Sequence, residues 1–156
     1  MGIEENKALV RRYFEDAPDN PAACEEIFAP KVLWHALYHT EHPDYGSTPQ
    51  LERRAYEQHK RIWGRWIETI STLFAEDDRV MVHWVGQGRQ QAAYFGIPPT
   101  NKLVRFSGLY IFRIANGKIV EIWNLWDRAG EWQQLGILPP TRELIARARE
   151  RMLAEE

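Results

Sequence analysis

Acid–base chemistry near neutral pH is the chemistry that this sequence offers most directly. Asp127 stands at the end of the last predicted strand, and His35 stands near the end of the first. A carboxylate or a neutral imidazole can remove a proton from a carbon beside a carbonyl group. We therefore take Asp127 and His35 as candidate catalytic bases.

Each of these residues also has a structural interpretation. Asp127 could cap a short helix around Trp132, because aspartate accepts hydrogen bonds from the first backbone N–H groups of a helix. His35 and His83 alternate with apolar neighbours along their strands, so either could be a buried or subunit-contact residue whose nitrogens are satisfied. We keep His83 as a candidate ligand-binding residue, with the structural interpretation beside it.

Tyr110 and Asn124 form a second candidate constellation. They fall on the two arms of one predicted hairpin, so both polar tips could meet at one carbonyl oxygen as a neutral hydrogen-bond clamp. A buried Tyr–Asn hydrogen bond that holds the sheet together fits the same positions. Aromatic side chains are unusually frequent, with 7 Trp, 6 Tyr and 6 Phe. Those expected to line a cavity or the adjoining core are Tyr13, Trp34, Tyr110, Phe112 and Trp126.

A metal centre is the least supported of the possible sites. His35, His39, His42 and Asp44 lie close together in sequence, but the segment leaves a strand and meets Pro43. Local structure therefore does not align these side chains as ligands. We predict neither a metal nor another cofactor.

The elements that position these residues follow from periodicity and turn chemistry. Helical spacing or a cap followed by proline predicts helices at about 3–16, 21–28, 49–64 and 140–156. The residues expected to face the core are Leu51, Ala55, Ile62 and Trp66 for the third helix, and Leu144, Ile145, Ala148 and Met152 for the last. Alternating patterns predict strands at 31–36, 66–74, 79–90, 102–115 and 118–127. The pair Asn116-Gly117 is a strong hairpin signal, because both residues tolerate positive φ.

Helices followed by a meander of strands predict an α+β fold, with the helices on one face of a curved antiparallel sheet and a cavity at its open end. We expect one domain over residues 1–156, with a core at about 6–139 and an additional C-terminal helix. The 20 basic and 22 acidic residues offer no reason to expect nucleic acid. There is no apolar run of bilayer length, no signal peptide and one cysteine, Cys24, so we predict a cytoplasmic protein that does not bind membranes.

Several motifs resemble the SnoaL-like polyketide and ester cyclase family. The opening helix at 6–14, Ala29-Pro30 before His35, the loop Gly96-Ile-Pro-Pro-Thr, and the closing hairpin that begins at Asn116 match in order. The resemblance implies the cone-shaped fold of nuclear-transport-factor-2-like proteins, and commonly a homodimer formed through the sheet. It also implies intramolecular aldol closure of an aromatic polyketide ester without a cofactor.

The family positions that carry acid–base groups are altered here. The resemblance places the family's aspartate at Asn124, its pocket histidine at Tyr110 and a further histidine at Gln90. An asparagine can form hydrogen bonds but cannot shuttle a proton. Three hypotheses remain: a cyclase or isomerase acting on a small apolar carbonyl compound, a non-catalytic protein that binds such a compound, and an epoxide hydrolase with a cluster of Arg105, Asp127 and Arg128.

Overall fold

The structure is a computed structural model that describes residues 2–36 and 44–154. Helices and strands fall close to the predicted segments. The helices are α1 (Ile3–Glu15), the 3-10 turn η1 (Pro21–Ala23), α2 (Cys24–Ile27), α3 (Pro49–Trp63), α4 (Arg128–Leu135) and α5 (Thr141–Ala154). The strands are β1 (Phe28–Ala36), β2 (Tyr45–Ser47), β3 (Ile67–Glu76), β4 (Arg79–Arg89), β5 (Leu103–Ala115) and β6 (Lys118–Trp126).

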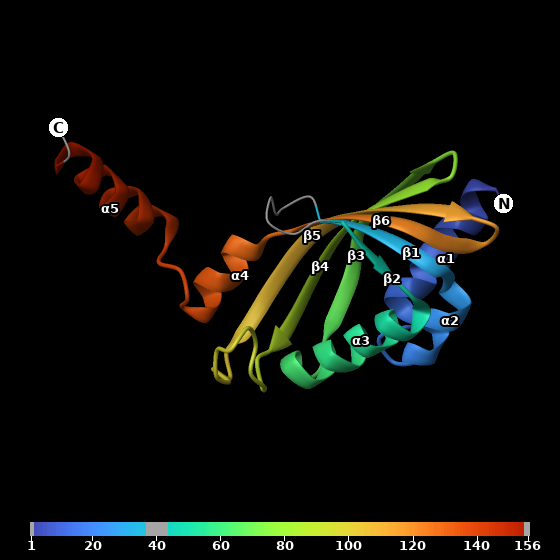
Figure 1. The fold of residues 1–156 in the computed structure, drawn as a ribbon, viewed down its shortest axis with the longest axis horizontal. Coiled ribbons are helices and arrows are strands. Elements are labelled where there is room, and N and C mark those ends of the chain that lie inside the picture. Colours follow the sequence, from blue (N-terminus) through green and yellow to red (C-terminus); the bar gives the residue numbers. More distant parts are fainter. Residues whose placement is uncertain (1, 37–43, 155–156) are drawn as a thin grey trace.

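The strands form one curved sheet in the order β2-β1-β6-β5-β4-β3 (Figure 1). Strands β3 to β6 are the predicted antiparallel meander. The contact between β1 and β6 is parallel, so the sheet is antiparallel except at this pair. The two strands are far apart in sequence: β2, helix α3 and the strands β3 to β5 lie between them along the chain. The short edge strand β2 falls outside the strands predicted from the sequence.

Residues that tolerate a positive φ form the turns of two hairpins, β5–β6 and β3–β4. Asn116 and Gly117 have φ of 51° and 74°, as the predicted hairpin turn requires. Asp77, in the turn between β3 and β4, also has a positive φ of 50°. In β5 every even-numbered residue from Val104 to Ile114 is buried, whereas the odd-numbered residues are exposed or half-buried. The sheet therefore has one inner and one outer face.

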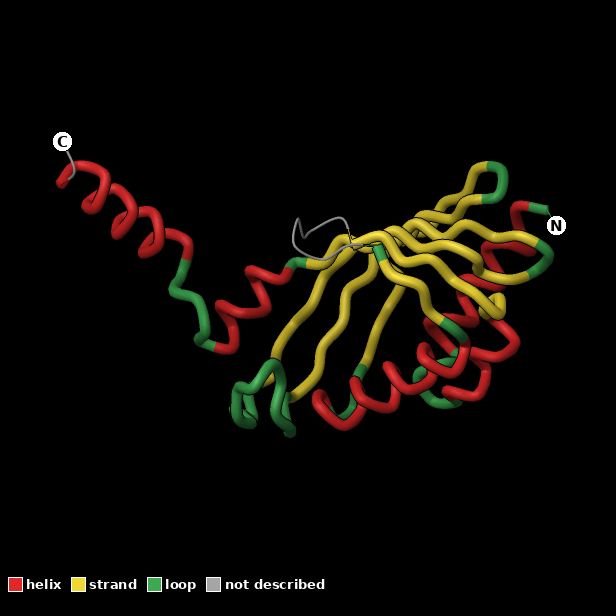
Figure 2. Tube along the Cα trace, in the orientation of Figure 1, coloured by secondary structure: helices red, strands yellow, loops and turns green. Residues whose placement is uncertain are grey.

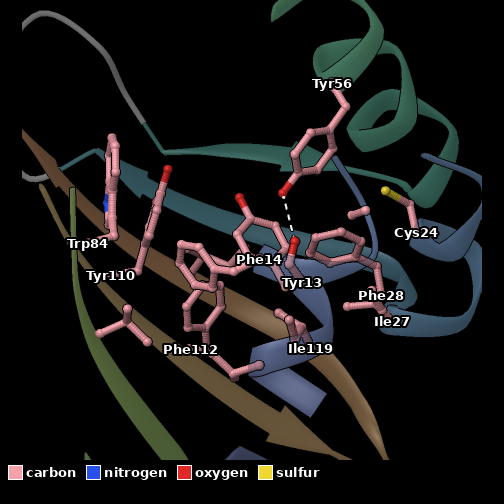
Figure 3. Close-up of a cluster of buried hydrophobic side chains, with 14 of the residues drawn as sticks. Tyr13, Phe14, Cys24, Ile27, Phe28, Tyr56, Trp84, Tyr110, Phe112 and Ile119 are labelled. Atoms are coloured by element: carbon pink, nitrogen blue, oxygen red, sulfur yellow. Dashed lines mark hydrogen bonds between the residues drawn. The ribbon is translucent and has the colours of Figure 1, made fainter. Parts of the chain in front are cut away.

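Helices α1, α2 and α3 lie together on the inner face (Figure 1, Figure 2). Aromatic rings fill the space beneath them, with Tyr13 and Phe14 of α1 against Tyr110 and Phe112 of β5 (Figure 3). The Tyr13 ring lies 5.2 Å from that of Phe112 and 6.1 Å from that of Tyr110. Such packing buries large apolar areas and favours tilted or edge-to-face rings.

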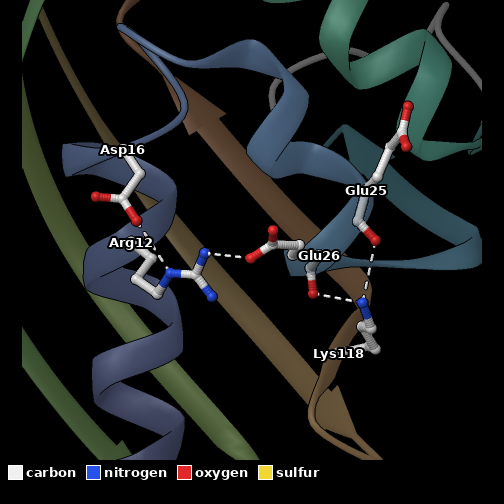
Figure 4. Close-up of polar contacts among 5 residues, drawn as sticks. All are labelled: Arg12, Asp16, Glu25, Glu26 and Lys118. Carbon is white, nitrogen blue, oxygen red and sulfur yellow. Dashed lines mark hydrogen bonds and ion pairs between the residues drawn. The ribbon is translucent and has the colours of Figure 1, made fainter.

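Polar contacts connect the helical layer to the sheet. Arg12 donates to Asp16 on the same helix and to the Glu26 carboxylate of α2 at 2.7 Å. Lys118, at the start of β6, donates to the backbone oxygens of Glu25 and Glu26, where α2 ends (Figure 4). A cation at a helix C-terminus satisfies carbonyl groups that have no partner within the helix.

Helix α5 projects away from the sheet (Figure 1), and none of its residues is buried. The expectation that its apolar residues face the core is therefore wrong for the isolated chain: Ile145 is 62% exposed and Met152 is 66% exposed. The helical periodicity identified the helix correctly, but it carries no information about what the apolar stripe contacts. Within the described ranges, no helix is both long enough and apolar enough to cross a membrane.

Candidate functional site

A cavity of about 390 Å³ lies between α3 and the inner face of the sheet. Its aromatic wall is formed by Tyr13, Trp34, Tyr45, Tyr56, Tyr110 and Trp126. Its polar groups belong to Ser47, Glu52, His59, Asn124 and Arg128. Few, well-placed polar groups in a mainly aromatic wall are typical of sites for small organic molecules.

Three tyrosines meet at the wall of this cavity. The Tyr13 ring lies 5.7 Å from that of Tyr56 and 6.1 Å from that of Tyr110. The Tyr56 hydroxyl donates to the backbone oxygen of Tyr13 at 3.2 Å (Figure 3). Burial raises the pKa of all three hydroxyls well above the usual value for tyrosine. They are therefore neutral at physiological pH and can act as hydrogen-bond donors.

Tyr110 and Asn124 lie side by side on the inner face, as the sequence predicts. They are direct partners in the antiparallel pairing of β5 with β6. Asn124 is 9% exposed, and its Oδ1 atom has no hydrogen-bond partner among the described residues. The predicted alternative, a Tyr–Asn hydrogen bond within the sheet, does not form. An unpaired buried amide oxygen is costly, so its position on a cavity wall indicates a site for a ligand.

Glu52 brings a carboxyl group to the cavity from the first turn of α3. Thr48 and Pro49 start this helix, and the Thr48 hydroxyl accepts a bond from the backbone of Leu51. Glu52 is only 6% exposed, and its Oε1 accepts a 2.8 Å hydrogen bond from the Trp34 indole. Burial raises the pKa of Glu52, although hydrogen bonds from Ser47 and Trp34 act in the opposite direction.

His59 follows Glu52 by seven positions, which is two helical turns, so both face the cavity. Burial, with a further contribution from the Arg128 charge, lowers the pKa of His59 to about 4. Its imidazole is therefore neutral at physiological pH and carries one unprotonated nitrogen. Glu52 and His59 thus have pKa values displaced in opposite directions within one cavity.

Arg128 closes another part of the wall. Its guanidinium donates to the Glu131 carboxylate at 2.9 Å and to the Tyr94 hydroxyl, and lies 4.9 Å from the centre of the Trp126 ring. The Glu131 side chain is fully buried. The buried carboxylate compensates the charge of Arg128, so this residue serves first to hold α4 and Tyr94 in place.

A family model for SnoaL-like polyketide cyclases matches residues 7–135. The chain belongs to the SnoaL-like polyketide cyclase family. A search among curated proteins finds no match.

Solved structures agree with the SnoaL-like fold. A candidate polyketide cyclase from Acidithiobacillus ferrooxidans has a TM-score of 0.73 at 21% identity, covering 86% of this chain and 97% of that one. AclR, a candidate hydroxylase from Streptomyces galilaeus, has a TM-score of 0.72 at 21% identity over 99% and 96% of the two chains. TsrD from Streptomyces laurentii has a TM-score of 0.75 at 19% identity over 88% and 99%. These names differ, so the shared fold does not determine an activity.

Asp127 lies outside the cavity of this SnoaL-like protein. Its side chain accepts a 2.9 Å hydrogen bond from the backbone of Gly130 and caps α4, which is the structural role considered for it. The carboxylate is exposed and lines a shallow hollow on the outer face of the sheet. Asp127 points away from the cavity because the side chains at the end of β6 alternate between the two faces of the sheet, and Trp126 occupies the inner face.

His35 also lies outside the cavity, on the outer face of β1. Its ring nitrogens contact Asp44 at 2.6 Å and Glu121 at 2.9 Å, and its ring stacks on Trp123 at 4.7 Å. Partial burial lowers the pKa of His35, but the hydrogen bonds with the two carboxylates outweigh this effect and raise it. A histidine held between two acids is poorly suited to accept a further proton from a substrate.

The other predicted residues divide between the two faces. Tyr13, Trp34 and Trp126 line the cavity, whereas Phe112 packs beneath the tyrosines in the core. His83 lies on the outer face and contacts the Ser107 hydroxyl at 3.1 Å. The Arg105, Asp127 and Arg128 cluster suggested for an epoxide hydrolase is not assembled: only Arg128 reaches the cavity.

The proposed cluster of metal-ligating histidines can be placed only in part, because His39 and His42 lie outside the described residues. Over residues 2–36 and 44–154, no group of three or more His, Cys, Asp or Glu side chains is arranged to hold a metal ion.

Glu52 and His59 were missed in the sequence because the apolar stripe was placed on Leu51, Ala55 and Ile62. In the structure Leu51 and Ala55 line the cavity instead of the core, and Leu51 is 47% exposed. The face that turns inward carries Glu52, Tyr56 and His59, at spacings of four and three residues. That spacing was the available signal, but a carboxylate is normally assigned to the solvent side of a helix.

Proposed function

We propose that the chain is an acid–base enzyme that needs no cofactor and cyclises or isomerises a small apolar carbonyl compound. The observation that carries the proposal is the pair of ionisable groups, Glu52 and His59, in one aromatic-lined cavity with opposite pKa displacements. Environments that move two such values apart separate the roles of acid and base. The names of the cyclase neighbours support a polyketide as the natural class of substrate.

Each side chain has a role in this proposal. The unprotonated nitrogen of His59 removes a proton beside the carbonyl group, in the role predicted for Asp127 or His35. The Asn124 amide and the Tyr110 hydroxyl donate hydrogen bonds to the enolate oxygen, which is the predicted neutral clamp. Glu52, a buried carboxyl group at the cavity wall whose pKa is raised by burial, is the group that protonates the new alkoxide. The aromatic wall holds the substrate in a folded, reactive conformation.

Proton exchange tests the proposal without the natural substrate. We expect the protein to accelerate exchange of the α-protons of α-tetralone, an apolar bicyclic ketone, in deuterated buffer, as followed by NMR. His59→Gln should abolish the acceleration, whereas His83→Gln, a matched change on the outer face, should retain it. A wild-type protein that binds the ketone but exchanges its protons no faster than buffer would contradict the enzymatic role.

Non-catalytic binding is a second candidate function, favoured by the residues at the family's acid–base positions. Gln90 is fully buried, donates to backbone oxygens of Ala92 and Pro98, and accepts from Thr100. Gln90 therefore holds the loop between Ala92 and Thr100 in place and does not reach the cavity. Recovery of a bound ligand unchanged after long incubation would favour this function over catalysis.

We also propose a homodimer formed through the outer face of the sheet. Three exposed apolar side chains on that face support it: Leu33, Val85 and Leu125 are 39%, 41% and 42% exposed. Replacing Val85 with a charged residue should then lower the mass measured by light scattering from that of a dimer to that of one chain. An unchanged dimer mass would exclude this face as the dimer interface.

A further inference from the structure

His59 forms part of the wall between two hollows. One is the cavity described above. The other, called here the side hollow, lies between the loop after α1, the end of α3 and the start of β3, and is lined by residues that include Asp19, Tyr56, His59, Lys60, Arg65 and Trp66. Among the described residues, Tyr56 and His59 alone line both hollows.

The aromatic neighbours of His59 support this two-sided position. Its ring lies 5.4 Å from that of Trp66, which lines the side hollow, and 6.2 Å from that of Trp126, which lines the cavity. Because the two nitrogens of an imidazole lie on different edges of the ring, one can face each hollow.

A neutral imidazole needs one hydrogen-bond acceptor and one donor, since one nitrogen carries a proton and the other a lone pair. In the part of the chain that the structure describes, no hydrogen bond to either nitrogen of His59 is formed within the protein. In enzymes that use a histidine base, a partner on the far nitrogen usually fixes the tautomer and the orientation of the ring.

The side hollow offers a place for such a partner. Its volume is about 40 Å³, enough for a single ordered water molecule. Asp19, Lys60 and Arg65 surround it with charged groups that can complete the hydrogen bonds of that water.

We propose that the side hollow binds a water molecule that accepts a hydrogen bond from one ring nitrogen of His59 and leaves the other nitrogen unprotonated toward the cavity. This role rests on His59 as the base of the proposed function. The water makes no contact with the substrate. Lys60 and Asp19 then act as positioning residues through the water and not as catalytic ones.

NMR of the histidine ring nitrogens tests this inference directly, because their chemical shifts report the tautomer. The wild-type protein should show one tautomer of His59 at neutral pH. Lys60→Trp fills the side hollow and should give a mixture of tautomers, while α-tetralone exchange falls about tenfold and ketone binding is unchanged. Gln58→Trp, on an exposed position of the same helix, is the matched control and should change neither property.

A second variant guards against an indirect effect of the bulky side chain. Asp19→Leu removes a polar partner of the water without filling the helix face, and should also mix the tautomers. Mixed tautomers in the wild type, or a single tautomer retained in both variants, would overturn the inference. A single tautomer that Lys60→Trp abolishes, in a wild-type protein with no exchange activity, would support the water site and reject the enzymatic function.

Discussion

The indole Nε1 of Trp34 donates a 2.8 Å hydrogen bond to Glu52 Oε1 at the wall of the cavity. This contact joins the first strand to the first turn of α3. It supplies a buried carboxyl group with a donor and fixes its direction, which a flexible glutamate side chain does not do alone.

Trp34→Phe should therefore lower the free energy of unfolding by about 1–3 kcal/mol, because a buried carboxyl group loses one of its hydrogen-bond donors. It should also raise the pKa of Glu52 further, since the lost bond favours the carboxylate. Because the pKa of Glu52 is raised in the folded state, the folded protein binds a proton at Glu52 more tightly than the unfolded chain does. The contribution of Glu52 to the free energy of unfolding is therefore present at low pH and decreases as pH rises through the pKa of Glu52 in the folded protein. Urea titrations across the acidic range measure both effects, and Glu52→Gln should remove this pH dependence.

The activity of His59 should depend on pH with an acid limb near its pKa of about 4, because only the neutral imidazole is a base. The rate of α-proton exchange, which uses His59 as base and does not need Glu52 as acid, should be lost as pH falls through this value and stay constant from there to neutrality. In the double variant Arg128→Gln with Glu131→Gln, the acid limb should move toward the ordinary value near 6.5, because the Arg128 charge is one cause of the low pKa of His59. Glu131 is changed as well so that its buried carboxylate is not left without a partner. A limb that does not move would exclude Arg128 as a cause.

Asn124→Leu should lower α-proton exchange by about a hundredfold, as expected for loss of a donor to the enolate oxygen. Its effect on stability should be small or favourable, because the unpaired Oδ1 disappears from a buried position. Rates and thermal unfolding measured on the same preparation separate the two. Slower exchange that merely parallels a loss of stability would indicate a structural role.

Asp127→Ala should lower the free energy of unfolding by about 1 kcal/mol through loss of the α4 cap and leave the exchange rate unchanged. Asp127→Asn, which can still cap the helix, should keep most of this stability. If the alanine variant folds normally but loses the activity, Asp127 is the base after all.

Much of the fold is predictable because it depends on neighbours in sequence. The Asn116-Gly117 turn, the alternation along β5 and the Asp127 cap all arise from short-range conformational preferences. Tyr110 and Asn124 could be assigned to the two arms of one hairpin for the same reason. Their direct pairing could not, because a bulge near Arg113 and Ile114 shifts the register that the two-residue turn alone would set.

Tertiary structure alone decided the rest. The parallel pairing of β1 with β6, the inward turn of Glu52 and His59, and the exposure of α5 depend on contacts between distant segments. Residue type by itself would place a glutamate in solvent and an apolar helical stripe in a core. Glu52 is buried because Trp34, 18 positions earlier in the chain, offers it a hydrogen bond, and α5 is exposed because the body of the chain offers its stripe no surface. A side chain's preference is local, but the partner that satisfies it is supplied only when the chain folds.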